Sequence, residues 1–275
     1  MKLHILTLNW NGKEELKSLF PRLKDNLDLL KEKNDIDYEW HIKDNGSKDG
    51  SLDYARGLTI FGLNVSAYSI GHNRDNFSKG VNYLFKKANT DNDDLILLLN
   101  NDVSFGDNTS IIKMFNLLTP DVGVVGAKLK YTNSNKLQHA GVIFSERYGK
   151  MPYHFKHKEE CDKSSNVNRY FQAVTGACCL LRASDFLAVN GMNEFYFWAF
   201  EDIDFCLKIG QNKKIAYCGE TNIYHKESAT LEKNPVNKMF LQQNVKLFKD
   251  RWFGKYEIDH DKYLNDNSYN EIKAK

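Results

Sequence analysis

The sequence has few of the features that mark the more specialised protein classes. Its cysteines are odd in number and, apart from one adjacent pair, scattered, which fits neither a disulfide framework nor a Cys-x-x-Cys metal site. These five residues are Cys161, Cys178, Cys179, Cys206 and Cys218. We therefore expect reduced, buried thiols.

Charge of one sign and long apolar runs are also missing. The 38 Lys and Arg residues nearly balance 36 Asp and Glu, so no overall field favours nucleic acid or an anionic membrane. No apolar stretch approaches the roughly 20 residues of a membrane-spanning helix. The opening "MKLHILTLNWNG" has too short an apolar segment for a signal peptide. These absences predict a soluble, cytoplasmic protein, and 41% hydrophobic residues can build a sizeable core.

The first half of the chain alternates short apolar runs with helical patterns. The expected strands are "KLHILTL", "YEWHIKD", "LNVSAYS" and "DLILLL", and the expected helices cover 14–33, a short segment ending at Arg56, and "NFSKGVNYLFKKA". This alternation predicts an α/β protein with a mostly parallel, doubly wound sheet. In such sheets, ligands bind beyond the carboxyl ends of the strands.

From about Tyr131 the pattern changes. "KLQHAGVIF" predicts an antiparallel strand, "FQAVTGACCLLRASDFLAV" a strand running into a helix, and "KKIAYC" a strand before "TNIYHKES". The segment "NPVNKMFLQQNVKLFKDRWFGKY" predicts an amphipathic helix ending near Gly254. We favour a helix that closes on the core; the alternative is peripheral contact with a membrane through its Lys and Arg residues.

Two polar turns follow predicted strands. In "DNGSKDGS", Asp44 stands where a strand-end carboxylate can accept a hydrogen bond from a base imide or a ribose hydroxyl, although these are also ordinary turn residues. In the "NND" turn, Asp102 offers a charged oxygen to a hard cation such as Mg²⁺ or Mn²⁺, and Asn100 can hydrogen-bond a ribose. A purely structural turn is an equally good reading of "NND" alone.

The segment "EDIDF" places Glu201 and Asp202 in the first turn of a predicted helix, where the helix dipole favours ionised carboxylates. An ionised carboxylate beside aromatic residues suits a general base that takes a proton from a hydroxyl. The simpler reading is that acidic residues favour helix N-termini. His225, in "NIYHKES", follows a strand-like run and by itself indicates nothing beyond a structural histidine.

Taken in order, six segments resemble the family-2 glycosyltransferases with the GT-A fold. They are "LTLNWNGKEEL", "DNGSKDGS", "LLLNNDV", "TGACCLLRASDF", "GMNEFYFWAFEDIDFCLK" and "IYHKES", which span Lys2 to Ser228. The resemblance is greatest to rhamnosyltransferases and other surface-polysaccharide enzymes. It implies a Rossmann-like, mostly parallel sheet flanked by helices, with a smaller antiparallel portion on the acceptor side. Residues 1–130 would bind the nucleotide-sugar, 131–230 the acceptor, and 231–275 would form a C-terminal helix and tail.

The resemblance also implies roles for particular residues. The metal would be held by Asp102 and His225, and Asp202 would be the catalytic base with Glu201 beside it. The residues implied at the nucleotide-sugar site are Thr7, Asn9, Asp44, Asn45, Lys79, Asn82, Asn100 and Asn101.

The chemistry implied by the resemblance is inverting transfer of a sugar with the help of Mn²⁺ or Mg²⁺. A UDP-sugar is the favoured donor, and dTDP- and GDP-sugars are alternatives. The acceptor would be a glycan or a lipid-linked saccharide; a protein or a modified nucleic-acid base stays open. His139, His154 and His157 either border the acceptor cleft or are surface residues. The oligomeric state is left open.

The sequence departs from the family pattern at three places. Asn100 replaces the first acid of the Asp-x-Asp motif, Asn76 replaces a glycine in "NRDNF" after Asn73 and Arg74, and Asn193 replaces the acid before Glu194. Two other functions remain alternatives. A nucleotidyltransferase would normally carry a basic, phosphate-binding loop near the N-terminus, and a non-catalytic nucleotide- or carbohydrate-binding protein would not need "ED".

Overall fold

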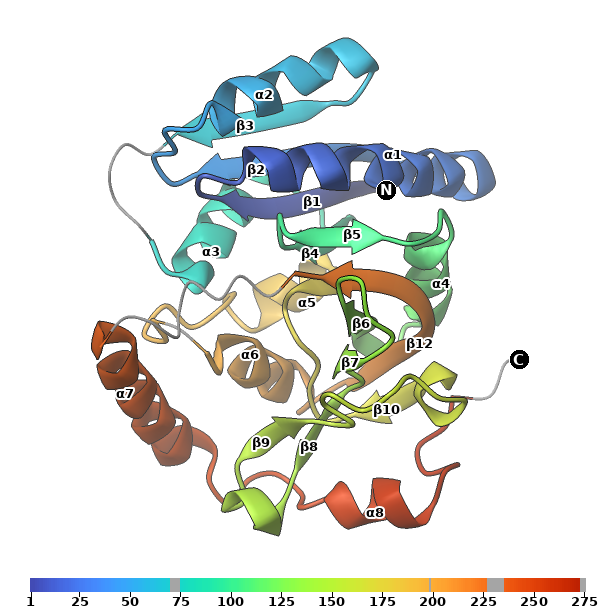
Figure 1. Cartoon of the computed structure of the whole chain (residues 1–275), viewed down its shortest axis with the longest axis vertical. Helices are drawn as coiled ribbons and strands as arrows, with labels where there is room; N and C mark the ends of the chain where they lie inside the picture. The colour runs from blue at the N-terminus through green and yellow to red at the C-terminus, as the bar shows by residue number, and fades with distance from the viewer. Residues whose placement is uncertain (70–74, 198, 227–234, 273–275) are drawn as a thin grey trace.

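The structure, a computed structural model, describes residues 1–69, 75–197, 199–226 and 235–272, with only the backbone for 235–238. A ten-stranded sheet runs through the molecule (Figure 1). Its main path is β10-β12-β6-β11-β4-β1-β2-β3, with β5 paired to β12 and β7 to β6. Strands from both 1–130 and 131–230 therefore belong to the same sheet.

The first half folds as a parallel sheet with connecting helices. Its elements are β1 (Lys2–Asn9), α1 (Lys13–Asn34), β2 (Asp37–Asp44), α2 (Ser51–Gly57), η1 (Leu58–Phe61), β3 (Val65–Ser69), α3 (Phe77–Ala88) and β4 (Leu95–Leu99). Strands β4, β1, β2 and β3 are mutually parallel. The predicted strands and helices of this half are confirmed. Each apolar run is long enough for one buried strand, and each segment with apolar residues at a spacing of 3.6 residues forms one helix.

The rest of the chain, from Val103 onward, contributes shorter and more mixed elements. They are β5 (Val103–Phe105), α4 (Ser110–Leu117), β6 (Val122–Tyr131), β7 (Leu137–His139), β8 (Val142–Phe144), η2 (Glu146–Tyr148), β9 (Pro152–His154), η3 (Ser164–Asn166), β10 (Arg169–Phe171), β11 (Cys178–Arg182), α5 (Ala183–Ala188), α6 (Glu201–Ile209), β12 (Lys214–His225), α7 (Pro235–Trp252) and α8 (His260–Asn265). Strand β11 lies antiparallel between β4 and β6, and β12 is parallel to β6. A small antiparallel sheet of β8 and β9 stands apart.

Helices cover both faces of the sheet. Along β4, Leu95, Leu97 and Leu99 pack in the cluster with α1, α2 and α4, whereas Ile96 and Leu98 pack in the cluster with α3, α5 and α6. A strand that is buried on both faces needs apolar side chains on both, so polar and apolar residues do not alternate along it. This explains the continuous apolar run of β4. Burial of each such side chain contributes about 1.5–3 kcal/mol, so β4 is a rigid support for the polar turn that follows it.

Two strand predictions in the second half were wrong in their bounds. "KLQHAGVIF" forms two strands, β7 and β8, because Gly141 turns the backbone at a φ of +102°. A Cβ atom at Gly141 would lie 2.4 Å from the Phe171 ring, so the turn also depends on the absence of a side chain. Conversely, "KKIAYC" and "TNIYH" form one strand, β12, which a register shift between Cys218 and Ile223 interrupts.

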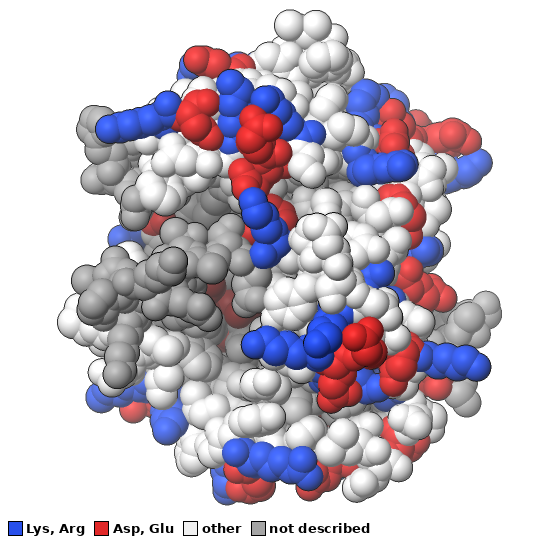
Figure 2. All heavy atoms as spheres, in the orientation of Figure 1, with Lys and Arg blue, Asp and Glu red and all other residues white. Residues whose placement is uncertain are grey.

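The C-terminal helix α7 packs against α6. Phe248 is fully buried, and the Trp252 indole donates a hydrogen bond of 2.7 Å to Asp204. No helix among the described residues is long and apolar enough to cross a membrane. On the face drawn in Figure 2, basic and acidic side chains of the described residues are interspersed. Charge on that face therefore gives no support to membrane contact, which stays a prediction.

Candidate active site

The carboxyl ends of β1, β2 and β4 are joined by a network of polar side chains. Asn9 donates from Nδ2 to Asp44 Oδ2 at 2.9 Å and accepts at Oδ1 from Asn101 Nδ2, also at 2.9 Å. The other oxygen of Asp44 accepts from the backbone N–H groups of Gly46 and Ser47. Asn9 and Asp44 are almost completely buried. The structure thus brings three of the predicted nucleotide-site residues together.

A close backbone approach at Gly12 makes room for this network. A Cβ atom there would lie 2.3 Å from Asn101 Nδ2 and 2.5 Å from Asn9 Oδ1. Both separations are below any normal contact, although the backbone at Gly12 has an ordinary negative φ of −115°. The glycine in "LNWNG" is therefore required by space and not by backbone conformation.

Asp102 and His225 meet where β5 pairs with the end of β12. His225 lies opposite Val103 in that antiparallel pairing, and Asp102 comes directly before Val103 in the chain. Asp102 Oδ1 and His225 Nε2 are 3.0 Å apart, and Asn100 Nδ2 lies 3.4 Å from the same ring nitrogen. The other nitrogen, Nδ1, is 2.6 Å from Gln138 Oε1.

These donors fit a divalent cation. An amide oxygen only accepts hydrogen bonds, so Gln138 places the proton of a neutral His225 on Nδ1 and leaves the Nε2 lone pair directed at Asp102. In that state, Asp102 Oδ1 and His225 Nε2, which are 3.0 Å apart, can both bind one cation. Adjacent ligands of an octahedral ion with bonds near 2.1 Å are about 3 Å apart. Carboxylate and imidazole are both ligands that Mn²⁺ accepts.

Asp202 is held by backbone N–H groups from two segments. Gly176 donates to Oδ2 at 3.0 Å, and Ile203 donates to Oδ1 at 2.9 Å. The carbonyl of the neighbouring residue, Ala177, accepts from the backbone N–H of Asn100 at 2.9 Å. The segment "TGA" thereby links the carboxylate of "ED" to the start of "NND" through two consecutive residues.

The backbone before Asp202 is strained and is supported by α7. Ala199 and Phe200 have φ values of +65° and +72°, which cost non-glycine residues on the order of 1–3 kcal/mol each. The buried carboxylate of Asp204 compensates by accepting from Arg251 Nε at 2.8 Å and Trp252 Nε1 at 2.7 Å. The turn that directs "ED" is therefore held in place by a helix more than 40 residues further along the chain.

Glu201 differs from the residue beside it. Burial and the charge of Asp202 raise the pKa of Glu201 to about 8, and its Oε2 is shielded from solvent without a hydrogen-bond partner among the described residues. The expectation that the helix dipole keeps both carboxylates ionised is therefore wrong for Glu201, because desolvation outweighs the dipole. Of the pair, Asp202 is the one whose carboxylate oxygens are both held by backbone N–H groups.

The remaining predicted nucleotide-site residues have other surroundings. Thr7 is fully buried and accepts from Trp40 Nε1 at 2.8 Å, so its side chain has no surface for a ligand. Asn45 accepts a hydrogen bond from Lys43 and is half-buried. On α3, Lys79 is exposed, and the Asn82 amide bonds the backbone of Met192. The Asn45 backbone N–H donates to the Asn9 carbonyl at 2.8 Å. Among the described residues, no side chain of these four residues is hydrogen-bonded to the side chains of the Asn9 network.

The substitution of Asn76 for glycine has a local explanation. Asn76 caps α3 by accepting from the Lys79 N–H at 2.8 Å, and its amide donates to the Glu194 carbonyl at 2.8 Å. The side chain thus fixes both the helix start and the segment before "FYFW". Asn73 and Arg74 lie outside the described residues.

His139, His154 and His157 form a cluster. His139 is fully buried, and its Nδ1 is 2.8 Å from His154 Nδ1, whereas His154 and His157 are half-buried. Burial holds the pKa of His139 well below its ordinary value. His139 therefore supports His154 from beneath and does not itself reach a surface. Next to them, the rings of Tyr148 and Tyr153 stack at 4.1 Å between centroids and are partly exposed.

Comparison with known proteins assigns a family to this arrangement. The model for "Glycosyl transferase family 2" matches residues 13–175, which is more than half of the chain. The chain belongs to glycosyl transferase family 2. The match includes Asp44 and Asp102, and it ends just before Gly176, well short of Asp202 and His225.

Two curated proteins are similar over part of this family-2 chain. The uncharacterized protein y4gI of Sinorhizobium fredii is 32% identical over 170 residues, which are 58% of this chain and 18% of that protein. The O-antigen biosynthesis protein RfbC of Myxococcus xanthus is 28% identical over 144 residues, or 50% of this chain and 11% of that protein. The chain thus spans less than a fifth of the length of either relative.

Solved structures show that the fold is GT-A. The mannosyltransferase PcManGT of Pyrobaculum calidifontis, in complex with GDP-Man and Mn²⁺, superposes with a TM-score of 0.63 at 11% identity, over 94% of this chain and 65% of that chain. Residues 1–349 of TarS from S. aureus, in complex with UDP, give a TM-score of 0.58 at 15% identity, over 97% and 79%. At such low identity these similarities establish the fold and not the substrate.

Sequence reasoning missed three residues that shape the candidate site of this family-2 chain. Gln138 directs His225, Gly176 holds Asp202, and Asp204 anchors α6 to α7. Gln138 stands beside His139 in "KLQHAG", so a polar residue in an otherwise apolar strand was the available signal. Asp204 carried a signal too, because it falls on the inward face of the helix that "EDIDF" begins.

Proposed function

We propose that this chain transfers a sugar from a nucleotide-sugar to an acceptor hydroxyl by inverting single displacement, with Asp202 as the general base. The observation that supports this most is the connection through "TGA": Gly176 holds the Asp202 carboxylate, and Ala177 holds Asn100, which lies beside Asp102 and His225. A base and a phosphate-side cation site are thus fixed relative to one another, as a displacement reaction requires.

In the proposed step, Asp202 takes the proton of the acceptor hydroxyl, and the oxygen forms a bond to the anomeric carbon. The bond from that carbon to the nucleotide diphosphate breaks, and the diphosphate leaves with the electron pair. Attack from the opposite face inverts the anomeric configuration. Glu201, protonated near neutral pH because burial raises its pKa to about 8, adds no second negative charge beside the base.

Asp102 and His225 would hold the divalent ion, with Mn²⁺ or Mg²⁺ as candidates. When bound, such an ion offsets the charge that develops on the leaving diphosphate. The single acid of "NND" makes His225 necessary to the site, and Gln138 keeps the His225 lone pair available. The complexes of PcManGT with GDP-Man and Mn²⁺ and of GalNAc-T7 with UDP, GalNAc and Mn²⁺ support a metal-assisted reaction on this fold.

The donor is proposed to be a UDP-sugar, with dTDP- and GDP-sugars as alternatives. The network of Asn9, Asp44 and Asn101 would form the floor beneath the nucleoside. Solved relatives carry UDP in one case and GDP-Man in another, so the fold accepts either base. The similarity to an O-antigen biosynthesis protein favours a saccharide acceptor, on a growing glycan or a lipid carrier. Family membership favours this reaction over nucleotidyl transfer.

The decisive experiment measures release of the nucleotide diphosphate from UDP-, dTDP- and GDP-sugars by the purified full chain. We expect release with one nucleotide class in the presence of Mn²⁺, loss with EDTA, and recovery when Mn²⁺ is restored. Asp102→Ala should remove it, and the exposed Asp121→Ala should not. Absence of release with every donor, or full activity in Asp102→Ala, would refute the proposal.

A further inference from the structure

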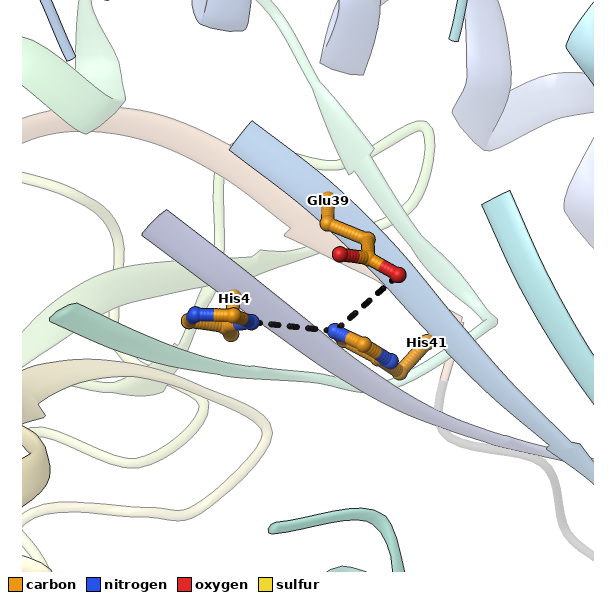
Figure 3. A group of neighbouring side chains, drawn as sticks. All are labelled: His4, Glu39 and His41. Atoms are coloured by element: carbon orange, nitrogen blue, oxygen red, sulfur yellow. Dashed lines mark hydrogen bonds and ion pairs between the residues drawn. The ribbon is translucent and has the colours of Figure 1, made fainter. Parts of the chain in front are cut away.

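A second group of metal-ligating side chains lies near the opposite end of the same strands. His4 of β1 and Glu39 and His41 of β2 project from one face of the sheet (Figure 3). His4 is the register partner of Glu39, and His41 follows two residues later on the same face. At about 3.3 Å per residue, His4 is roughly 16 Å along β1 from Asn9. This group is therefore separate from Asp102 and His225.

The donor atoms converge as ligands of a small ion do. His4 Nδ1 and His41 Nε2 are 3.0 Å apart, His41 Nε2 and Glu39 Oε1 are 3.8 Å apart, and all three lie within 4.8 Å of one another. Around Zn²⁺ with bonds of about 2.0–2.1 Å, tetrahedral ligands are separated by about 3.3 Å. The first two separations lie on either side of that value. Rotation of the partly exposed Glu39 side chain would shorten the remaining separation, between the Glu39 carboxylate and His4 Nδ1.

The groups behind the three donors are those that orient metal ligands. His4 Nε2 is 3.3 Å from Asp94 Oδ2, an arrangement in which a carboxylate fixes the ring and directs the other nitrogen toward the ion. The Glu39 carboxylate accepts from Lys2 Nζ at 2.6 Å and from Ser66 Oγ at 2.8 Å. Each side of the cluster is thus held by a further hydrogen bond.

Both imidazoles are held in place by burial and by neighbouring groups. His4 and His41 are almost completely buried. The contacts from Asp94 to His4 and from His4 to His41 hold the two rings toward one another. His41 Nδ1 is buried without a partner among the described residues, so the contacts of this ring are made at Nε2.

We propose that His4, Glu39 and His41 form a binding site for a Zn²⁺-class divalent ion, with water as the fourth ligand. Two imidazoles and one carboxylate favour Zn²⁺ over the harder Mn²⁺ and Mg²⁺. The site joins β1 to β2 near their amino ends and does not take part in sugar transfer. It is independent of the proposed function, because no residue is shared between the two.

Equilibrium dialysis of the full chain against Zn²⁺, with the bound metal counted by mass spectrometry, tests the site. Asp102→Ala is used as the background, to remove the other candidate site. We expect one bound Zn²⁺ per chain, and a Co²⁺-loaded form with the strong visible absorption of tetrahedral coordination. His41→Gln and Glu39→Gln should each lose the ion, and Zn²⁺ should then no longer raise the Tm. The half-buried His260→Gln, outside the cluster, should retain it.

Glu39→Gln keeps an oxygen and an N–H group in place and is the variant least prone to misfold. If His41→Gln does not fold, Glu39→Gln decides the outcome. Zn²⁺ binding that survives in folded Glu39→Gln or His41→Gln would overturn the proposal, as would absence of binding in the background chain. Asp94→Asn, which keeps the ligands but weakens their orientation, is expected to raise the Kd about 10- to 100-fold.

Discussion

The two ends of β1 and β2 both carry buried polar side chains, but different partners satisfy them. At the carboxyl end, backbone N–H groups of the following turn, those of Gly46 and Ser47, hold one oxygen of Asp44, and Asn9 holds the other. Nearby, the backbone N–H of Gly176 holds Asp202 in the same way. At the amino end, His4, Glu39 and His41 bond mainly other side chains, and His41 Nδ1 has no partner within the described residues.

This difference separates two kinds of site. Backbone donors cannot rotate away, so the carboxyl end is fixed before any ligand binds, which suits a reaction that needs preorganised charge. Side-chain donors can rearrange, so the amino end can exchange hydrogen bonds for coordinate bonds when an ion binds. A buried polar residue in a strand therefore indicates the kind of site only when its hydrogen-bond partner is also known.

The largest expected effect comes from removing the base at the carboxyl end. Asp202→Asn should lower kcat for transfer by about 100- to 10,000-fold, the usual contribution of a general base. Binding of the nucleotide-sugar, measured by calorimetry, should be unchanged because the amide oxygen of the variant can still accept from Gly176. Asp53→Asn makes the same change in the first turn of α2 and should have no effect. Full transfer activity in Asp202→Asn would exclude this residue as the base.

The next effect concerns the pH dependence of stability. The pKa of Glu201 is raised from 4.5 to about 8, so the folded state retains a proton that the unfolded state loses. This group therefore lowers stability progressively as pH rises from about 4.5 to 8, by on the order of a few kcal/mol, and has no further effect above 8. Urea unfolding between pH 5 and 8 should show a shallower decline for Glu201→Gln than for the wild type. Parallel curves would contradict the assignment.

A smaller effect is expected at the positioning residue Gln138. Gln138→Leu removes the oxygen that accepts from His225 Nδ1 and should raise the Kd for Mn²⁺ about 10- to 100-fold. At saturating Mn²⁺ kcat should return close to normal, whereas Gln138→Glu, which keeps an acceptor oxygen, should bind Mn²⁺ normally. A lower kcat at saturating metal in Gln138→Leu would indicate a different role.

The smallest effect tests how tightly the nucleotide-side network is packed. Gly12→Ala should displace Asn9 or Asn101 and cost about 1–2 kcal/mol of stability through a lost buried hydrogen bond, with weaker donor binding. Gly57→Ala is the matched control, because a Cβ atom there meets nothing within 4 Å, and it should be neutral or slightly stabilising. Equal melting temperatures for the two variants would show that the side chains of Asn9 and Asn101 can move to make room for a Cβ atom without loss of stability.

The first half of the fold was predictable because each of its elements is revealed by the spacing of apolar residues within a short segment. Each apolar run formed one strand, and each segment with a 3.6-residue apolar spacing formed one helix. Strand β6 was not predicted, although "VGVVGAKLKY" is apolar, and Gly126 in it is packed against Val174 from a distant segment. The division of "KLQHAGVIF" at Gly141 likewise depends on Phe171, which no local pattern reveals.

The sequence proposes site residues where a residue type limits the chemistry, as for Asp102 and Asp202, whose roles stay predictions. The site was not predictable where long-range pairing decides the role. The raised pKa of Glu201 follows from its burial in the folded chain and from the charge of Asp202, and the hydrogen bond that occupies Thr7 comes from Trp40. The strand position of Gln138 is local, but its effect on His225 depends on tertiary structure.

The pairing of β5 with β12 has a consequence for synthesis of the chain. Asn100 and His225 are 125 residues apart in sequence, and His225 reaches its place only when β12 has added to the sheet. A nascent chain on the ribosome can form the parallel strands and the Asn9 network long before that. It would then have the Asn9 network without the imidazole beside Asp102, so the order of synthesis itself delays completion of the candidate cation site until β12 has joined the sheet.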